Sequence, residues 1–203
     1  MKKWLIPVIV ILVVVFGVYN WGKNFNNEAV VLQEDAKTTW SNVESSYQRR
    51  NDLIGNLIKT VQGAADFERT TLTEVIEARA KATSVNINAG DLTADNMAQF
   101  QQAQSGLTGA LSKLLVSVER YPELKANQNF LELQSQLEGT ENRINVARDR
   151  FNEGVNNYNK HIKVFPNSVL AGMFNFDEMD RYSSDTGSEK APDASFDFNK
   201  KKE

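Results

Sequence analysis

The feature that most constrains this chain is an apolar run close to its N-terminus. Residues 4–22 contain no charged side chain, and residues 5–18 are almost entirely Ile, Val, Leu and Phe. A helix of this length spans roughly 28 Å, close to the thickness of a bilayer's hydrocarbon core. Trp4 lies at one end and Trp21 at the other, where interfacial aromatic residues belong. The run predicts a transmembrane helix over residues 4–22, after a charged N-terminus at residues 1–3.

A cleaved signal peptide is the competing interpretation, because Lys2 and Lys3 precede a short apolar stretch. Signal peptidase requires a triplet with small outer residues, and no such triplet closes the run. We therefore favour a retained anchor in a single-pass membrane protein. Lys2, Lys3 and the α-amine oppose Lys23 alone, so the positive-inside rule keeps the N-terminus cytoplasmic and places the body outside.

Apolar residues in the body recur at helical spacing. After residue 26 one stripe advances in alternate steps of four and three residues: Ala36, Trp40, Val43, Tyr47, Arg50, Ile54, Leu57 and Val61. This seven-residue repeat is typical of a coiled-coil seam, and similar stripes follow Gly63, Thr93 and Pro122. Thr93, with Asp95 in the turn that follows, predicts the N-cap of its helix. We predict an all-α fold, with an antiparallel four-helix, coiled-coil-like bundle over residues 26–175.

The end of the chain changes character twice. Pro166 stops the last long helix, and residues 168–176 form a short apolar patch. We favour a patch that caps the open end of the bundle, although docking to a partner or to the membrane remains open. Residues 176–203 are rich in Ser, Asp, Lys and Glu without periodicity, which predicts a disordered C-terminal tail.

One charged residue interrupts the apolar seam. Arg50 occupies a core position, and a buried charge needs a partner because leaving it unpaired costs several kcal/mol. The last helix breaks its stripe around Glu141. We hypothesise that Arg50, or its neighbour Arg49, pairs with Glu141 across the bundle and fixes the register; a solvated surface cluster is the alternative.

Asparagine is unusually frequent in the last helix. Four of these residues, Asn142, Asn152, Asn156 and Asn159, define a possible polar groove that would grip a ligand or a peptide. Structural hydrogen bonding between helices is the simpler interpretation, and we favour it.

The sequence contains none of the motifs by which common catalytic sites are recognised. Cysteine is absent and His161 is the single histidine, without the Glu-x-x-His motif of a di-iron bundle. No nucleotide-binding loop or nucleophile motif is present, and the nearly balanced charges form no basic face for nucleic acid. We expect no catalytic residue, cofactor or metal site, and no nucleic-acid partner.

Several segments resemble the LemA family of bacterial membrane-anchored proteins. These segments cover residues 40–44, 48–57, 77–80, 121–127 and 137–144, then continue through Phe151 and Tyr158 to Pro166. The resemblance implies an N-terminal membrane segment followed by a helical bundle, with no catalytic residues to carry over. Gly55 stands where the family commonly has proline.

The anchor, the heptads and the missing chemistry together suggest a function. We hypothesise a noncatalytic interaction or scaffold module of the bacterial cell envelope. Its expected partners are the lipid bilayer, through residues 4–22, and envelope proteins or other copies of itself. The alternative is a ligand-binding or sensory subunit that uses the asparagine-lined groove.

Overall fold

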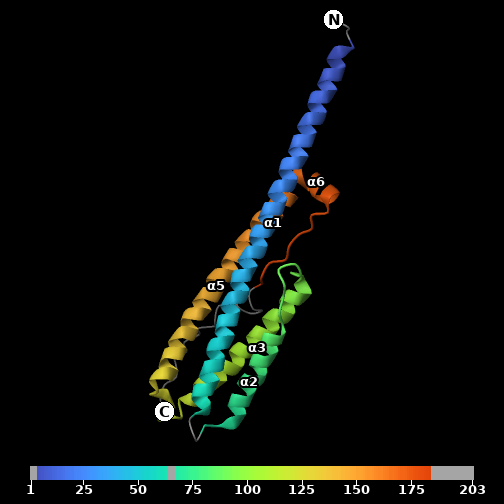
Figure 1. Ribbon diagram of the computed structural model, residues 1–203. Coiled ribbons are helices and arrows are strands. Elements are labelled where there is room, and N and C mark those ends of the chain that lie inside the picture. The colour runs from blue at the N-terminus through green and yellow to red at the C-terminus, as the bar shows by residue number, and fades with distance from the viewer. Residues whose placement is uncertain (1–3, 64–66, 184–203) are drawn as a thin grey trace, which may run out of the picture.

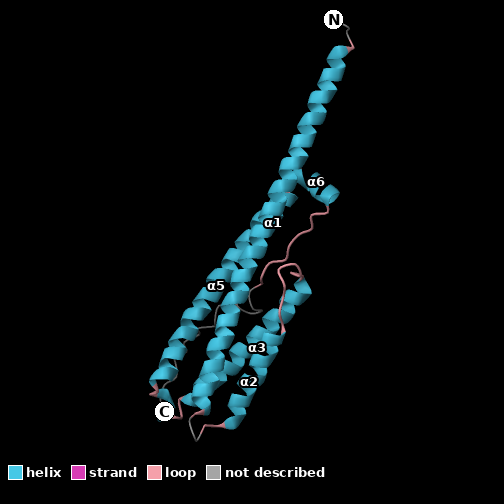
Figure 2. Cartoon of the chain, viewed as in Figure 1, coloured by secondary structure: helices cyan, strands magenta, loops and turns pink. Residues whose placement is uncertain are grey.

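The computed structural model describes residues 4–63 and 67–183. Within these ranges the chain forms six helices and no strand, which confirms the all-α class (Figures 1 and 2). The predicted charged N-terminus at residues 1–3 lies outside the described residues.

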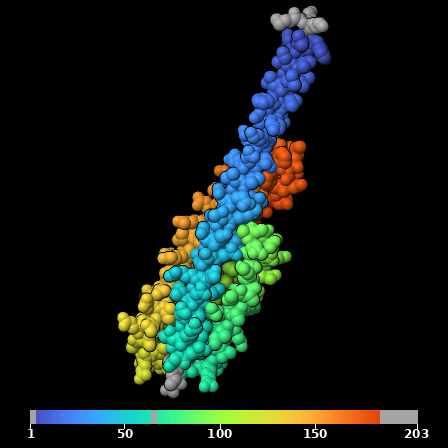
Figure 3. All heavy atoms as spheres, viewed as in Figure 1, coloured from blue at the N-terminus to red at the C-terminus, as the bar shows by residue number. Residues whose placement is uncertain are grey.

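The first helix, α1, runs without a break over Leu5–Gln62 and is the one described helix long and apolar enough to cross a membrane. Pro7 falls in its first turn, where a missing backbone donor leaves no hydrogen bond unmade. Most of the apolar run, up to Tyr19, is exposed and projects beyond the body (Figure 3), while Trp21 at its end packs against the body. From Phe25 onward, one face of the same helix becomes buried.

The other helices pack along the lower part of α1 in alternating directions (Figure 1). Helix α5 lies antiparallel to α1 over much of its length, while α2 and α3 form a second antiparallel pair beside it. The helices after α1 are α2 (Arg69–Ser84), α3 (Ala94–Val118), α4 (Pro122–Lys125), α5 (Gln128–Lys163) and α6 (Asn167–Phe174).

Local sequence explains where these helices begin and end. The Thr93 hydroxyl accepts a hydrogen bond from the Asn96 amide and so caps α3, as the sequence pattern predicts. The Asn127 side chain caps α5 in the same way, by accepting from two backbone amides of its first turn. Pro122 opens the short α4, and Phe165 and Pro166 separate α5 from α6.

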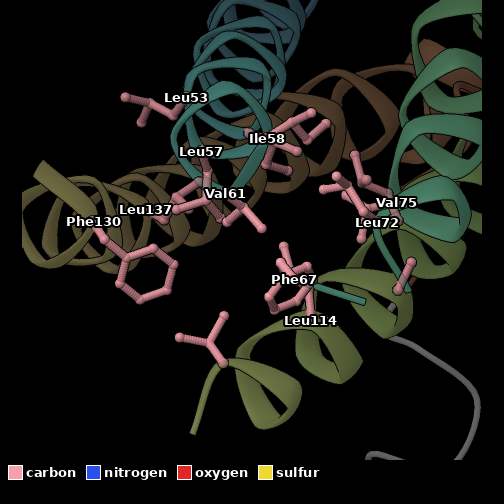
Figure 4. Close-up of a cluster of buried hydrophobic side chains, with 14 of the residues drawn as sticks. Leu53, Leu57, Ile58, Val61, Phe67, Leu72, Val75, Leu114, Phe130 and Leu137 are labelled. Atoms are coloured by element: carbon pink, nitrogen blue, oxygen red, sulfur yellow. The ribbon is translucent and has the colours of Figure 1, made fainter. Parts of the chain in front are cut away.

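The heptad stripe of α1 forms the centre of the core. Trp40, Val43, Ile54, Leu57 and Val61 are all fully buried. Near the end of α1, Ile54, Leu57 and Val61 meet apolar side chains from the other helices (Figure 4), including Leu72 and Val75 of α2, Leu114 of α3 and Leu137 of α5. Each such side chain contributes about 1.5–3 kcal/mol when it is buried.

The prediction places the start of the disordered tail too early, at residue 176, because residues 176–183 pack against the helices. Tyr182 is only 5% exposed and belongs to the apolar cluster around Trp40. Composition misses this packing because two or three anchoring side chains in a polar segment produce no periodic signal. The remainder of the predicted tail, residues 184–203, lies outside the described residues.

Helices α1 and α5 approach each other closely at Gly154. A Cβ atom at this position would lie 3.3 Å from the Cα atom of Ala36, so a larger side chain must push the two helices apart. We expect Gly154→Leu to lower the free energy of unfolding by about 1–3 kcal/mol. The melting temperature of the detergent-solubilised chain should then fall by about 2–4 °C for each kcal/mol of lost stability.

Gly139→Leu is the matched control, because Gly139 lies on the same helix with nothing within 4 Å of the added atom. Leucine is a better helix former than glycine, so this variant should melt at or above the wild-type temperature. Equal melting temperatures for the two variants would contradict the close approach.

Candidate functional site

The candidate functional site is a pair of asparagines on α5 that hold the segment 176–183. Asn159 donates to the Met179 carbonyl (2.8 Å) and accepts from the Met179 amide (2.9 Å). Asn152 makes the same two bonds with Tyr182, at 2.9 and 2.8 Å. We call Asn152 and Asn159 the asparagine clamp.

The geometry of the clamp follows from two regular repeats. Asn152 and Asn159 are seven residues apart, which is about 10.5 Å along a helix. Met179 and Tyr182 are three residues apart, which is about 10 Å along an extended chain. The two separations match in length, so Asn152 and Asn159 each reach the carbonyl and the amide of one residue of the segment. Both bonds of each asparagine go to backbone atoms. The clamp therefore depends on the conformation of the bound segment and not on the identity of its side chains.

Side chains of the segment add specificity to the backbone contacts. The Tyr182 hydroxyl lies 2.9 Å from that of the buried Tyr47 on α1, and the Arg148 guanidinium covers the Tyr182 ring at 4.0 Å. Burial raises the pKa of Tyr47, with a further contribution from Tyr182, so this phenol stays neutral at physiological pH. The Tyr158 hydroxyl donates to the Asp177 carbonyl, while Ser183 bonds to Gln101 of α3.

Three of the four predicted groove residues therefore line the path of this segment. Asn156 is exposed and accepts a hydrogen bond from Arg181 at 2.7 Å, beside the clamp. Asn142 is exposed on α5, and no described contact joins it to the segment. The occupant of the asparagine face is a segment of the chain itself, and neither a ligand nor a neighbouring helix. The seven-residue spacing of Asn152 and Asn159 was the available signal.

The hypothesised polar pair joins three helices. Arg50 is 4% exposed, its Nη1 lies 3.4 Å from Glu141 Oε2, and its Nη2 donates to the Thr108 hydroxyl of α3. The Glu141 side chain is 49% exposed, so solvent screens its half of the pair. Arg49 points to the exposed side of α1 and takes no part in this contact.

A polar cleft of about 450 Å³ lies between α1, α2 and α3. Asn51 and Gln104 line it, and their buried side-chain oxygens have no hydrogen-bond partner in the described part of the chain. Arg79 also lines it and donates through Nε to the Asn51 carbonyl. Burial raises the pKa of the neighbouring Glu44. These oxygens suit hydrogen-bond donors such as water or the N–H groups of a small molecule.

No metal-ligating constellation was found among the described residues, since no three His, Cys, Asp or Glu side chains converge. The ring of His161 instead stacks on Phe25 of α1, with the ring centroids 5.1 Å apart. Its surroundings are those of a packing residue at the end of a helix.

The chain is a helical protein in which one long helix, the single candidate membrane span among the described residues, continues into an all-helical body. The model of the LemA family matches residues 39–196, and the chain belongs to this family.

Curated relatives agree with this assignment at low identity. The chain is 27% identical to the magnetosome protein MamQ of Magnetospirillum gryphiswaldense over 173 residues, 77% of this chain and 64% of the relative. It is 21% identical to protein LemA of Metamycoplasma hominis over 168 residues, 79% and 73% of the two chains. The chain spans less than two thirds of the length of the MamQ proteins that it matches.

The clamp makes a direct prediction for the Asn152→Ala/Asn159→Ala double variant. Removing both amides deletes four hydrogen bonds to the backbone of residues 179 and 182. Losing about 1–3 kcal/mol of local stability should accelerate amide hydrogen exchange in this segment by about tenfold to a hundredfold. Mass spectrometry of the peptide that covers residues 176–183 measures the change.

Asn157→Ala is the control, because Asn157 is exposed on the same helix and lies outside the clamp. Its exchange should match that of the wild type. Wild-type protection in the double variant would show that the clamp does not hold the segment.

The polar pair makes a second prediction. Arg50→Ala removes the contacts with Glu141 and Thr108 together, and should cost about 2–4 kcal/mol. Glu141→Ala should cost about 1 kcal/mol, because its carboxylate is half exposed and Thr108 still binds the guanidinium. Glu138→Ala, an exposed change on the same helix, should melt like the wild type. Wild-type melting of both Arg50→Ala and Glu141→Ala would refute the pairing.

Proposed function

We propose that this LemA-family protein is a membrane-anchored, noncatalytic interaction module of the bacterial cell envelope. The observation that carries the proposal is the asparagine clamp, which uses the most distinctive polar side chains of α5 to fix a backbone segment of the same chain. Side chains with that task serve to shape a surface, and they are not available to bind or activate a substrate.

The continuity of α1 supports the same conclusion. One helix carries both the apolar run and the heptad seam, so the body is coupled to the anchor without a flexible linker. In our proposal the long helices act as an antiparallel four-helix, coiled-coil-like bundle. The bundle would present its sides to envelope proteins or to other copies of the chain at a fixed distance from the bilayer.

The proposal places the body outside the cytoplasm. Lys2 and Lys3 precede the apolar run and Lys23 alone follows it, so the charge difference favours a cytoplasmic N-terminus. The interaction surface would then face the periplasm or its equivalent.

A single introduced cysteine tests orientation and interaction together, because the natural chain has no cysteine. Val116 on α3 is 72% exposed and therefore suits labelling in a Val116→Cys variant. Intact cells are treated with a membrane-impermeant maleimide that carries a photoreactive group, and then illuminated. We expect labelling without lysis, followed by discrete crosslinked bands that mass spectrometry identifies as envelope proteins or copies of the chain.

Val13→Cys, within the apolar run, is the control and should stay unlabelled. Labelling of Val116→Cys only after lysis would refute the orientation. Labelling without any protein adduct, at Val116 and equally at Asn156→Cys on α5, would refute the interaction module.

A further inference from the structure

Helix α6 exposes an apolar face at the end of the body nearest the apolar run. Its eight residues include no charged side chain. Leu170 and Ala171 are buried against Phe25 and Ala29 of α1, so one face caps the apolar cluster at this end. The other face remains uncovered: Val169, Met173 and Phe174 are exposed, together with Val164 and Phe165 just before the helix.

The exposure on this face is large for apolar side chains of this size. Met173 is 72% exposed and Phe165 is 79% exposed. Contiguous apolar groups of this kind on a protein surface usually mark a contact with a membrane or a partner.

The packing of α5 on α1 fixes the height of this face relative to the apolar run. The His161 ring stacks on Phe25, and Trp21 packs against the same cluster. Because the two helices are antiparallel, each residue beyond His161 lies level with an earlier residue of α1. Helix α5 ends at Lys163, two residues beyond His161, and α6 then packs in the same cluster as Trp21 and Phe25, so this face lies at the level where the apolar run ends. Figure 3 shows α6, in orange-red, beside α1 where the projecting helix enters the body.

From this register we infer that α6 and Phe165 form a second contact with the lipid bilayer. The inference rests on the proposed insertion of residues 4–22. Phe25, which stacks on α6 through Phe174, lies only about 4.5 Å along the helix beyond Gly22, within the headgroup region of the same leaflet. An apolar helix held there places its outer side chains at the boundary between headgroups and acyl chains.

Charges around the face indicate that the contact is mainly apolar. Lys23, Lys160 and Lys163 lie at this end of the body, but so do Glu28 and Glu178. Lys163 pairs with Glu178 at 2.6 Å, and Glu28 lies 3.7 Å from His161. The two signs are nearly balanced, so binding of α6 should depend little on anionic lipid.

The consequence for the whole molecule is a fixed tilt of the body. A single helix leaves the body free to rotate about its axis, whereas a second contact on one side of α1 defines which face of the body is turned toward the membrane. The clamped segment 176–183 follows α6 directly, so this contact also sets where that segment starts.

The test uses the full-length chain in vesicles of phosphatidylethanolamine and phosphatidylglycerol. A fluorescent dye is attached to one introduced cysteine at a time: Met173→Cys on α6, Val13→Cys in the apolar run, and Val116→Cys on the distant part of α3. The last site is as exposed as Met173, at 72%, and is the matched control. Lipids that carry a nitroxide near the headgroup end of the acyl chain then quench dyes that lie in the bilayer.

We expect about twofold quenching at Met173→Cys, quenching at Val13→Cys, and none at Val116→Cys. The quenching at Met173→Cys should persist when phosphatidylglycerol is replaced by a zwitterionic lipid. If Val13→Cys is quenched while Met173→Cys behaves like Val116→Cys, the α6 contact with the bilayer is refuted but the anchor is not. A protein partner would then be the better candidate to cover the apolar face of α6. If Val13→Cys is not quenched, both the anchor and the α6 contact are refuted.

Discussion

The antiparallel seam between α1 and α5 is the interaction on which the rest of the structure depends. It buries the heptad stripe of α1 and includes the close approach of Gly154 to Ala36. Since the seam fixes the register of the two helices, it also fixes which residues of α5 reach the end of the apolar run. The placement of α6 and of the segment that follows it are both consequences of that register.

The segment 176–183 connects α3 and α5 through hydrogen bonds on one side of the body. It bonds to α5 through Asn152 and Asn159, to α1 through the Tyr182 hydroxyl, and to α3 through Ser183. A short chain segment can do this because the step from Met179 to Tyr182 is about as long as the step from Asn152 to Asn159 along the helix. The side-chain amides of Asn152 and Asn159 therefore form their hydrogen bonds within the protein, and the segment 176–183 covers them.

Polar contacts between the helices differ in what they require. Arg50 is an inherently costly residue for an apolar seam, and it is tolerated because Glu141 and Thr108 supply acceptors from two other helices. The clamp uses neutral amides and demands less desolvation, but its geometry is stricter since each amide must face both groups of one backbone residue. The Arg50 contact links α1, α3 and α5, while the clamp joins the segment 176–183 to α5.

The sequence by itself determined the apolar run, the helical class, the N-terminal cap at Thr93 and the need for a partner at Arg50. These are local properties, set by spacing, capping and the cost of burying a charge. Only the tertiary structure decided that residues 176–183 are ordered, that Asn152 and Asn159 hold them, and that α6 lies beside the end of the apolar run. Those features join residues that are distant in the chain, and their positions depend on the α1–α5 register, which no local pattern specifies.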